Sequence, residues 1–566
     1  MDRKSLRGQR RHHNEQTAPC DSRKQLLEFE SSERVDPEQD TGHVFVLQCQ
    51  CEGVAADACL TVALENGEMV PCNIDSTEDQ VWLAPEKEAE EIDDALVTPT
   101  TVVYVGNLGA PNGVKNQTEA AKAVVSVVEK FFKLVGDQFK GEWSNFSRKK
   151  PLVAMPFPCN DETLSDDIVV TLLPVIYRAA ETYQLDFALC TPNKVHYTLL
   201  QIFRDDLCPW NDGPFWMVSD DLMEVAKDLA AIAKEGMLVT FFGAGVSYCA
   251  GAPSWSGLLQ YLAKQAGFSD TQCEDLTGLD YLDQATLLEK SFPGDEFKTQ
   301  IANAVDAEQF TPHHSLLATL GCQSITTNYD SLFEAAAKSG GDEVIVLPQQ
   351  VEKAGVQPET LEGEDCPTWL LKVHGTVEDP PSIVLSREDY MRYYANKSAL
   401  LGMVAHEMIV SHVLILGFSM TDTHLHESID TVRRILPNVC ERKLGTIVML
   451  KENAMFTALW EKEFNVVYMV DKDGSSSTGA WYLDAFIDCF VNMVQRKSQR
   501  GLIMHPKMRE FFTPAQDTMF NSVKEMLATI GERPSDEDGA AMWDRLYRFG
   551  KVRTLFNNLC CPLLLF

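Results

Sequence analysis

Residues 241–255, with the sequence FFGAGVSYCAGAPSW, follow an apolar run with side chains that are mostly small. Where a backbone must approach a ligand closely, small residues leave the chain free to adopt unusual dihedral angles and leave N–H groups open to an anion. The residues that fit this role are Gly243, Ala244, Gly245 and Ser247. The segment therefore predicts a phosphate-type anion site, although a tight turn in any α/β protein would use the same glycines.

The elements around this segment support the first interpretation. The preceding MLVTFF (237–242) predicts a strand buried on both faces. In the following WSGLLQYLAKQAG (255–267), apolar residues recur at the spacing of one helix face. Strand, glycine turn and helix form the unit that cradles phosphates in doubly wound α/β folds.

The same alternation of apolar runs and amphipathic helical patterns continues along most of the chain, which predicts parallel sheets covered by helices. We expect an α/β fold with two Rossmann-like parallel-sheet domains, at residues 41–208 and 219–498. The polar, aperiodic residues 1–40 predict a disordered tail. Residues 499–566 predict a small helical C-terminal region. In the first domain, Gly106 and Gly109 form the one loop suited to a nucleotide.

Charge and composition exclude several classes of protein. The 566 residues include 49 Lys and Arg against 83 Asp and Glu, a net charge of −34, which repels nucleic acid and anionic membranes. The 16 cysteines are scattered, as expected for reduced thiols in the cytoplasm. No apolar run reaches the roughly 18 to 20 residues of a membrane span. A short basic patch near Arg7, Arg10 and Arg11 leaves nuclear import open.

Four polar motifs follow predicted strands, where ligands bind in open α/β sheets. They are GAGVSYCAGAPSW (243–255), TTNYD (326–330), KVHG (372–375) and GFSMTD (417–422). In this order they resemble the sirtuin family, over about residues 236 to 425: GAG with a serine and G-x-P, then Asn and Asp, then His-Gly, then G-x-S. The similarity is greater to the SIR2-like domains of bacterial antiviral defence proteins and their animal relatives, which hydrolyse NAD.

The chain also departs from the sirtuin deacetylases. These enzymes have an arginine soon after G-x-P, where this chain has Trp255 or Ser256, and two Cys-x-x-Cys pairs that bind zinc after His-Gly. No cysteine lies between His374 and Gly417, so a four-thiolate zinc site cannot form there. Protein deacylation or ADP-ribosyl transfer is therefore disfavoured. Because His424 and His426 are expected on different helix faces, we predict no metal.

The resemblance implies a site for NAD as the substrate. The backbone N–H groups of Ala244, Gly245 and Val246 would hold its pyrophosphate. Breaking the bond from C1′ to the nicotinamide nitrogen gives the sugar oxocarbenium character, so water must be placed and a proton taken up. The resemblance implies that Asn328 positions water or the ribose and that His374 is the general base, with an unperturbed pKa of about 6.5.

The same resemblance implies contacts at both ends of the ligand. Asp330 would contact the nicotinamide side, and Trp255 would wall the nicotinamide pocket. The residues that would line the adenosine ribose are Gly417, Ser419 and Asp422. The predicted binding set is completed by Gly243, Ser247 and Pro253.

The resemblance thus implies an NAD glycohydrolase that gives nicotinamide and ADP-ribose or a cyclic form, as a homo-oligomer or filament in innate defence or NAD-depletion signalling. A non-catalytic sensor or scaffold that binds NAD or an ADP-ribose derivative is the main alternative. Each predicted catalytic residue also has a structural interpretation: Asn328 and Asp330 as a helix cap ahead of SLFEAAAK, and His374 as a core histidine.

Overall fold

A computed structural model describes most of the chain. The described residues are 41–62, 64–65, 68–69, 81–83, 101–105, 117–139, 148–158, 166–350, 368–436 and 442–502. The predicted tail at 1–40, the predicted helical region beyond residue 502, and Gly106 and Gly109 lie outside these residues.

The larger sheet has seven strands, all paired in parallel, in the order β11-β12-β10-β9-β13-β14-β15. They are β9 (Leu238–Phe242), β10 (Gln323–Thr326), β11 (Ile345–Leu347), β12 (Trp369–Lys372), β13 (His412–Leu416), β14 (Gly445–Lys451) and β15 (Phe464–Val470). Apart from the edge strand β11, this is the strand order of dinucleotide-binding folds. The order reverses between β9 and β13, and ligands bind at the carboxyl ends of strands at such a reversal.

A second sheet of six strands has the order β1-β8-β7-β2-β6-β5. Its strands are β1 (Val44–Leu47), β2 (Ala58–Val62), β5 (Val81–Leu83), β6 (Thr101–Val105), β7 (Leu152–Pro156) and β8 (Asp186–Cys190). Only β5 runs antiparallel to its neighbour. A separate antiparallel pair comprises β3 (Leu64–Glu65) and β4 (Glu68–Met69). The predicted fold class, α/β with two Rossmann-like parallel sheets, is confirmed.

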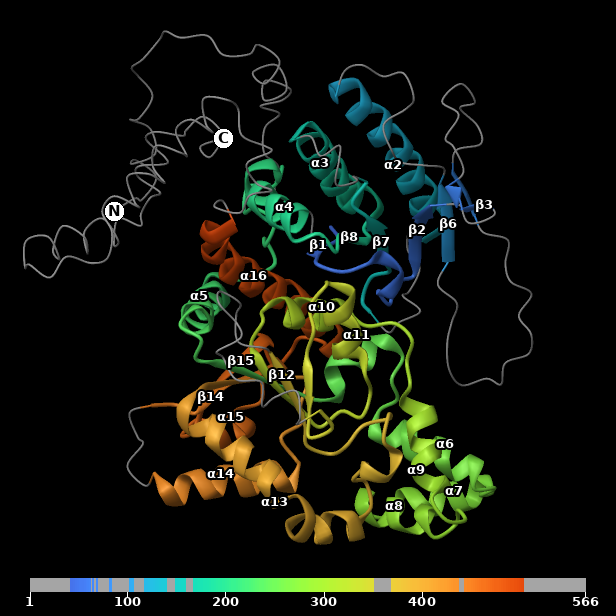
Figure 1. Ribbon diagram of the computed structural model, residues 1–566, viewed down its shortest axis with the longest axis vertical. Helices are drawn as coiled ribbons and strands as arrows, with labels where there is room; N and C mark the ends of the chain where they lie inside the picture. Colours follow the sequence, from blue (N-terminus) through green and yellow to red (C-terminus); the bar gives the residue numbers. More distant parts are fainter. Residues whose placement is uncertain are drawn as a thin grey trace, which may run out of the picture.

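Helices cover both sheets (Figure 1). They are α2 (Gln117–Phe139), α3 (Asp166–Tyr183), α4 (Lys194–Leu207), α5 (Asp220–Lys234), α6 (Trp255–Gln265), α7 (Asp270–Thr277), α8 (Tyr281–Glu289), α9 (Glu296–Val305), α10 (Pro312–Thr319), α11 (Leu332–Ser339), α13 (Arg387–Val410), α14 (Thr423–Ile435), α15 (Ala454–Trp460) and α16 (Ser476–Leu502). Helices α6 to α9 form a separate lobe, at the lower right of Figure 1. Among the described helices, none has the length and apolar character that crossing a membrane requires.

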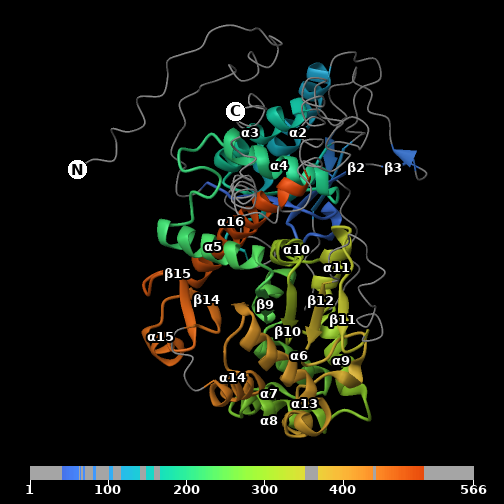
Figure 2. The same cartoon turned by 60° about the vertical axis from the view of Figure 1, so that its left-hand side comes forward.

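The two sheets share one hydrophobic core. Because successive strand residues point to opposite faces, Val44 and Val46 pack against α2 and α3, whereas Phe45 and Leu47 face the other way. On that second face, residues of both sheets join α5, α10 and α16 in one continuous cluster. Figures 1 and 2 show α16 running between the two sheet layers. The predicted boundary at 208–219 thus separates two sheets that share a core, and the domain limits stay a prediction.

Buried charges fix α16 in this core. Arg204 of α4 donates two hydrogen bonds to the carboxylate of Asp488 in α16, at 2.9 and 2.6 Å. His43 contacts the same carboxylate at 2.9 Å, and Arg148 donates to Asp484 at 2.6 Å. Burial alone would raise the pKa of Asp488, but Arg204 and His43 hold this pKa below its usual value. The ionised carboxylates therefore connect the first sheet to a helix from the far end of the described chain.

We expect Asp488→Asn to lower the free energy of unfolding by roughly 3–5 kcal/mol, because it leaves Arg204 charged, buried and unpaired. Asp430→Asn is the matched control, since Asp430 pairs with Arg434 on the surface and such pairs contribute at most about 1 kcal/mol. Urea unfolding of the full chain measures both. Equal losses in the two variants would contradict this role of the buried pair.

Candidate functional site

The loops after β9 and β13 touch each other through their backbones at the reversal of strand order. Gly243 and Gly245 donate N–H bonds to the carbonyl oxygens of Leu416 and Gly417, at 3.1 and 2.9 Å. A Cβ at Gly245 would lie 2.8 Å from the Cα of Gly417, and Gly417 itself has φ +58°. Glycine at positions 243 and 245 is therefore required by the contact between the two loops, whatever ligand approaches them.

Two of the three N–H groups predicted to hold a pyrophosphate donate hydrogen bonds within the protein. Residues 244–246 form a short 3-10 turn, in which the N–H of Val246 donates to Gly243 at 3.0 Å. The N–H of Gly245 donates to Gly417. These two groups therefore bond within the protein, so holding a pyrophosphate would require them to exchange or share those bonds. Ala244 and Gly245 are nevertheless exposed.

Ser247 is the centre of a buried hydrogen-bond cluster. Its hydroxyl donates to Asp330 at 2.9 Å and accepts from the side-chain amide of Asn328 at 3.0 Å. Nε2 of His314 lies 3.2 Å from the same hydroxyl. Because Nδ1 of His314 accepts from the backbone of Thr311, Nε2 carries the proton and donates to Ser247. The predicted residues Ser247, Asn328 and Asp330 are therefore brought together.

Asp330 also caps the start of α11, as the structural alternative for this residue predicted. Its second carboxylate oxygen accepts from the N–H of Leu332, the first residue of α11, at 3.2 Å. Burial raises the pKa of Asp330, and the ammonium of Lys372 opposes this effect. The side chain thus fixes the start of a helix and, through Ser247, the amide of Asn328.

A second buried cluster surrounds His374. Its Nε2 lies 3.1 Å from Nδ1 of His424 and 3.7 Å from a carboxylate oxygen of Asp422. The hydroxyl of Tyr390 donates to that oxygen at 2.7 Å. Burial lowers the pKa of His374 to about 4, below the unperturbed value expected from the sequence, because no water is left around the ring to stabilise its charge.

The two clusters emerge from neighbouring strands. In the parallel pair β10 and β12, Thr326 lies opposite Lys372. Asn328 and His374 each come two residues later, and the N–H of Val373 donates to Thr326 between them at 2.9 Å. Both side chains are therefore held at the carboxyl edge of the sheet.

Other predicted residues have different surroundings. Asp422, predicted at the adenosine ribose together with Ser419, lies 3.7 Å from His374 and caps α14 by accepting from the N–H of Leu425 at 3.1 Å. Ser419 is exposed and bonds Thr421 at 2.8 Å. Trp255 is the first residue of α6, half-buried, with its ring 6.4 Å from that of Tyr281. Pro253 lies half-buried in the loop before α6.

The sequence did not indicate three residues of these clusters: His314, Tyr390 and His424. His424 and His426 do lie on different faces of α14, as expected, since the first is buried and the second exposed. However, His424 meets His374 from another element, and no spacing along the chain could reveal that contact.

Among the described residues, one group has the donors to hold a metal ion: His374, Asp422 and His424, whose ligand atoms lie within 4.8 Å of one another. The same atoms also have hydrogen-bond partners within the cluster. The absence of a metal therefore stays a prediction.

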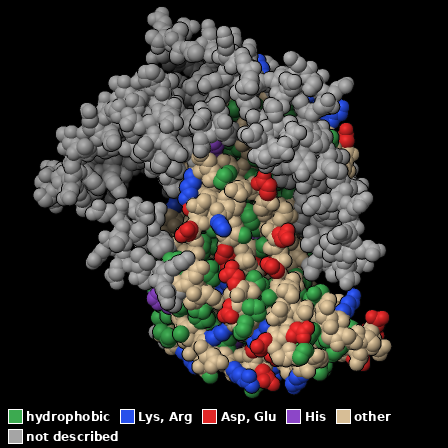
Figure 3. Space-filling view, turned by 45° about the vertical axis from the view of Figure 1, so that its right-hand side comes forward, with side chains coloured by type: hydrophobic (Ala, Val, Ile, Leu, Met, Phe, Trp, Pro, Cys, Tyr) green, Lys and Arg blue, Asp and Glu red, His purple; other side chains and the backbone are tan. Residues whose placement is uncertain are grey.

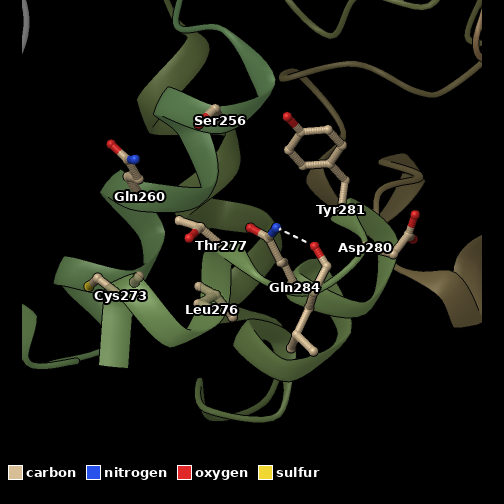
Figure 4. A pocket seen from close by; sticks show the side chains of 10 residues that line it. Ser256, Gln260, Cys273, Leu276, Thr277, Asp280, Tyr281 and Gln284 are labelled. Atoms are coloured by element: carbon tan, nitrogen blue, oxygen red, sulfur yellow. Dashed lines mark hydrogen bonds between the residues drawn. The ribbon is translucent and has the colours of Figure 1, made fainter. Parts of the chain in front are cut away.

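A cavity of about 330 Å³ lies elsewhere, in the lobe between α6, α7 and α8 (Figure 4). Its lining includes Ser256, Gln260, Thr277 and Tyr281, and the amide of Gln284 donates to the carbonyl of Leu279 at 2.8 Å. None of the predicted site residues lines it. The cavity is therefore separate from the two buried clusters.

Part of the chain is similar to known proteins. Residues 323–468 match the family model described as a SIR2-like domain. This span includes Asn328, His374 and the loop after β13. The chain contains a SIR2-like domain. The resemblance found in the sequence motifs is thereby confirmed.

Three curated relatives are similar to part of the chain. The NAD(+) hydrolase ThsA of Enterococcus faecium is 28% identical over 244 residues, 41% of this chain and 48% of that protein. ThsA of Bacillus cereus (strain MSX-D12) is 27% identical over 220 residues, 38% of this chain and 42% of that protein. Defense-associated sirtuin 2 of Bacillus subtilis is 24% identical over 232 residues, 39% of this chain and 22% of that protein. The matches thus cover less than half of each relative.

Gly245→Ala tests the backbone contact between the loops after β9 and β13. Its new methyl group would lie 2.8 Å from Gly417, so we expect the free energy of unfolding to fall by about 1–3 kcal/mol. Gly402→Ala, within α13 and with open space around it, should instead raise this free energy by up to about 1 kcal/mol. Urea unfolding compares them, and a neutral Gly245→Ala would show that the loops are not in contact.

Proposed function

We propose that this protein is an NAD glycohydrolase, which cleaves NAD to nicotinamide and ADP-ribose or its cyclic form. The observation that carries the proposal is the placement of a buried amide, Asn328, and a buried neutral imidazole, His374, after two paired strands. They extend from neighbouring strands at the carboxyl edge of a sheet with dinucleotide-binding order. The names of the ThsA relatives support NAD as the substrate.

The chemistry follows from these groups. When the bond from C1′ to nicotinamide breaks, its electron pair moves to the ring nitrogen and neutralises its charge. Water attacks C1′, and its proton passes to His374. Because burial holds the pKa of His374 near 4, its lone pair is available throughout the neutral range. Asn328, anchored by Ser247 at 3.0 Å, would orient the water or the ribose hydroxyls.

Surface charge does not favour a nucleic acid as the substrate. The net charge is −34. On the face shown in Figure 3, acidic side chains are spread over the described surface, and several basic ones lie toward its lower end. A nucleic-acid site would require a continuous basic surface, and the part of the described chain visible on that face presents none.

Asn328→Ala and His374→Ala should each reduce nicotinamide release by at least about a hundredfold, the low end for loss of a general acid or base. The double variant should be scarcely slower than the poorer single variant, because both groups serve one step. NAD affinity, measured by calorimetry, should change far less than turnover.

His412→Gln is the matched control, because His412 is a partly buried histidine that bonds Thr446 at 2.9 Å, at the start of β13. It should release nicotinamide at the parent rate. A folded His374→Ala protein that also kept the parent rate would remove the catalytic assignment, and retained NAD binding without turnover in the parent would favour a sensor.

The pH dependence of kcat/KM tests the environment of His374. The neutral imidazole is the active form, and it gains a proton only as the pH falls through about 4. We therefore expect a flat profile from pH 8 to about 5 and a loss of activity below it. A loss centred near pH 6.5 would show an exposed, unperturbed histidine instead.

The folded fraction has to be followed in the same buffers. In the unfolded chain His374 titrates near pH 6.5, so the unfolded state binds more protons between that pH and about 4. This group therefore stabilises the fold less as the pH falls through that window. Circular dichroism separates loss of structure from loss of the base.

A further inference from the structure

The ring of His424 is packed between aromatic side chains and contacts His374. Its side chain lies under α13, with the ring of Tyr390 stacked on it at 4.4 Å and 9°, and that of Tyr393 at 4.0 Å. Burial lowers the pKa of His424, which keeps the ring neutral. One orientation of this imidazole is therefore fixed.

The contact between the two histidines requires one proton. Nε2 of His374 and Nδ1 of His424 are 3.1 Å apart, and two neutral rings form such a bond only if one nitrogen donates and the other accepts. A carboxylate oxygen of Asp422 lies 3.7 Å from the same Nε2. The negative carboxylate favours a proton on the nitrogen that faces it, so Nε2 of His374 is the donor.

We propose that His424, together with Asp422, is the positioning residue that keeps the proton of His374 on Nε2 and so leaves Nδ1 as the basic nitrogen. Within the part of the chain that the structure describes, the hydrogen-bond contact of the His374 ring runs from Nε2 to His424. The ring nitrogen that would accept a proton during the reaction is thereby chosen by a residue that does not touch the substrate. This inference rests on the proposed function for its effect on rate.

A metal ion is the alternative ligand for the same three side chains. Nε2 of His374, Nδ1 of His424 and Oδ2 of Asp422 are close enough to share one ion. However, a metal would need the lone pair of Nε2, where Asp422 favours a proton, and would compete with the hydroxyl of Tyr390, which donates to the same Oδ2 at 2.7 Å. The hydrogen-bonded arrangement satisfies every one of these groups without an ion.

Two substitutions of His424 distinguish its role as a hydrogen-bond acceptor from the volume of its side chain. His424→Asn puts an amide oxygen near the position of Nδ1, so it can still accept from His374. His424→Leu keeps a similar volume and removes the acceptor. We expect His424→Leu to lower kcat at least about tenfold with KM little changed, as misplacing the proton of a catalytic histidine does. His424→Asn should restore most of this loss.

Nitrogen-15 NMR of histidine-labelled full-length protein reads the tautomer directly. His374, assigned by its absence in His374→Ala, should be protonated on Nε2 in the parent and in His424→Asn, and should lose this preference in His424→Leu. Circular dichroism and melting confirm that each variant is folded.

Several results would overturn the inference: a His374 protonated on Nδ1 in the parent, equal rates in His424→Leu and the parent, or stoichiometric Zn²⁺ binding that His424→Leu abolishes. If the parent releases no nicotinamide, the proposed function fails, while the NMR measurement still decides whether His424 sets the proton on His374.

Discussion

Helices α10 and α16 pack between the two sheets and hold them together. Both helices contribute to the core shared by the sheets, and buried ion pairs hold α16 there. Two residues before α10, Phe310 exchanges backbone hydrogen bonds with Gly53 and Ala55 of the first sheet's loop, at 2.9 and 2.8 Å. Since α10 carries His314, the first sheet positions one wall of the Ser247 cluster.

Burial determines the chemistry of the candidate site. Desolvation lowers the pKa of His314 to about 3 and that of His374 to about 4, so both imidazoles stay neutral where an exposed histidine would be partly charged. Two neutral rings can form a hydrogen bond with each other, as His374 and His424 do at 3.1 Å. Two charged rings could not, because their repulsion in a medium of low dielectric would far exceed the gain from one hydrogen bond.

Local patterns predicted the local structure well. The strand at 237–242 and the helix from Trp255 were readable because their signals lie in consecutive residues. Asn328 and His374 were indicated because each follows a recognisable strand, and their roles stay predictions. The partners of His374 were not predictable, since Tyr390 and His424 arrive from separate helices. The shared core was not predictable either, because the apolar residues of a strand do not indicate which helix will pack against them.

The covering of the first sheet by α16 has a consequence for biosynthesis. Cys190 ends the last strand of that sheet, and Asp488 of α16 is made about 300 residues later. At about 5–20 residues per second, the ribosome needs roughly 15 to 60 s to produce that stretch. During this interval the face that includes Phe45, Leu47 and Ala188 has no α16 to pack against. The nascent chain would therefore present an apolar surface of the kind that chaperones bind. The yield of folded protein in cells would depend on how long that surface stays exposed.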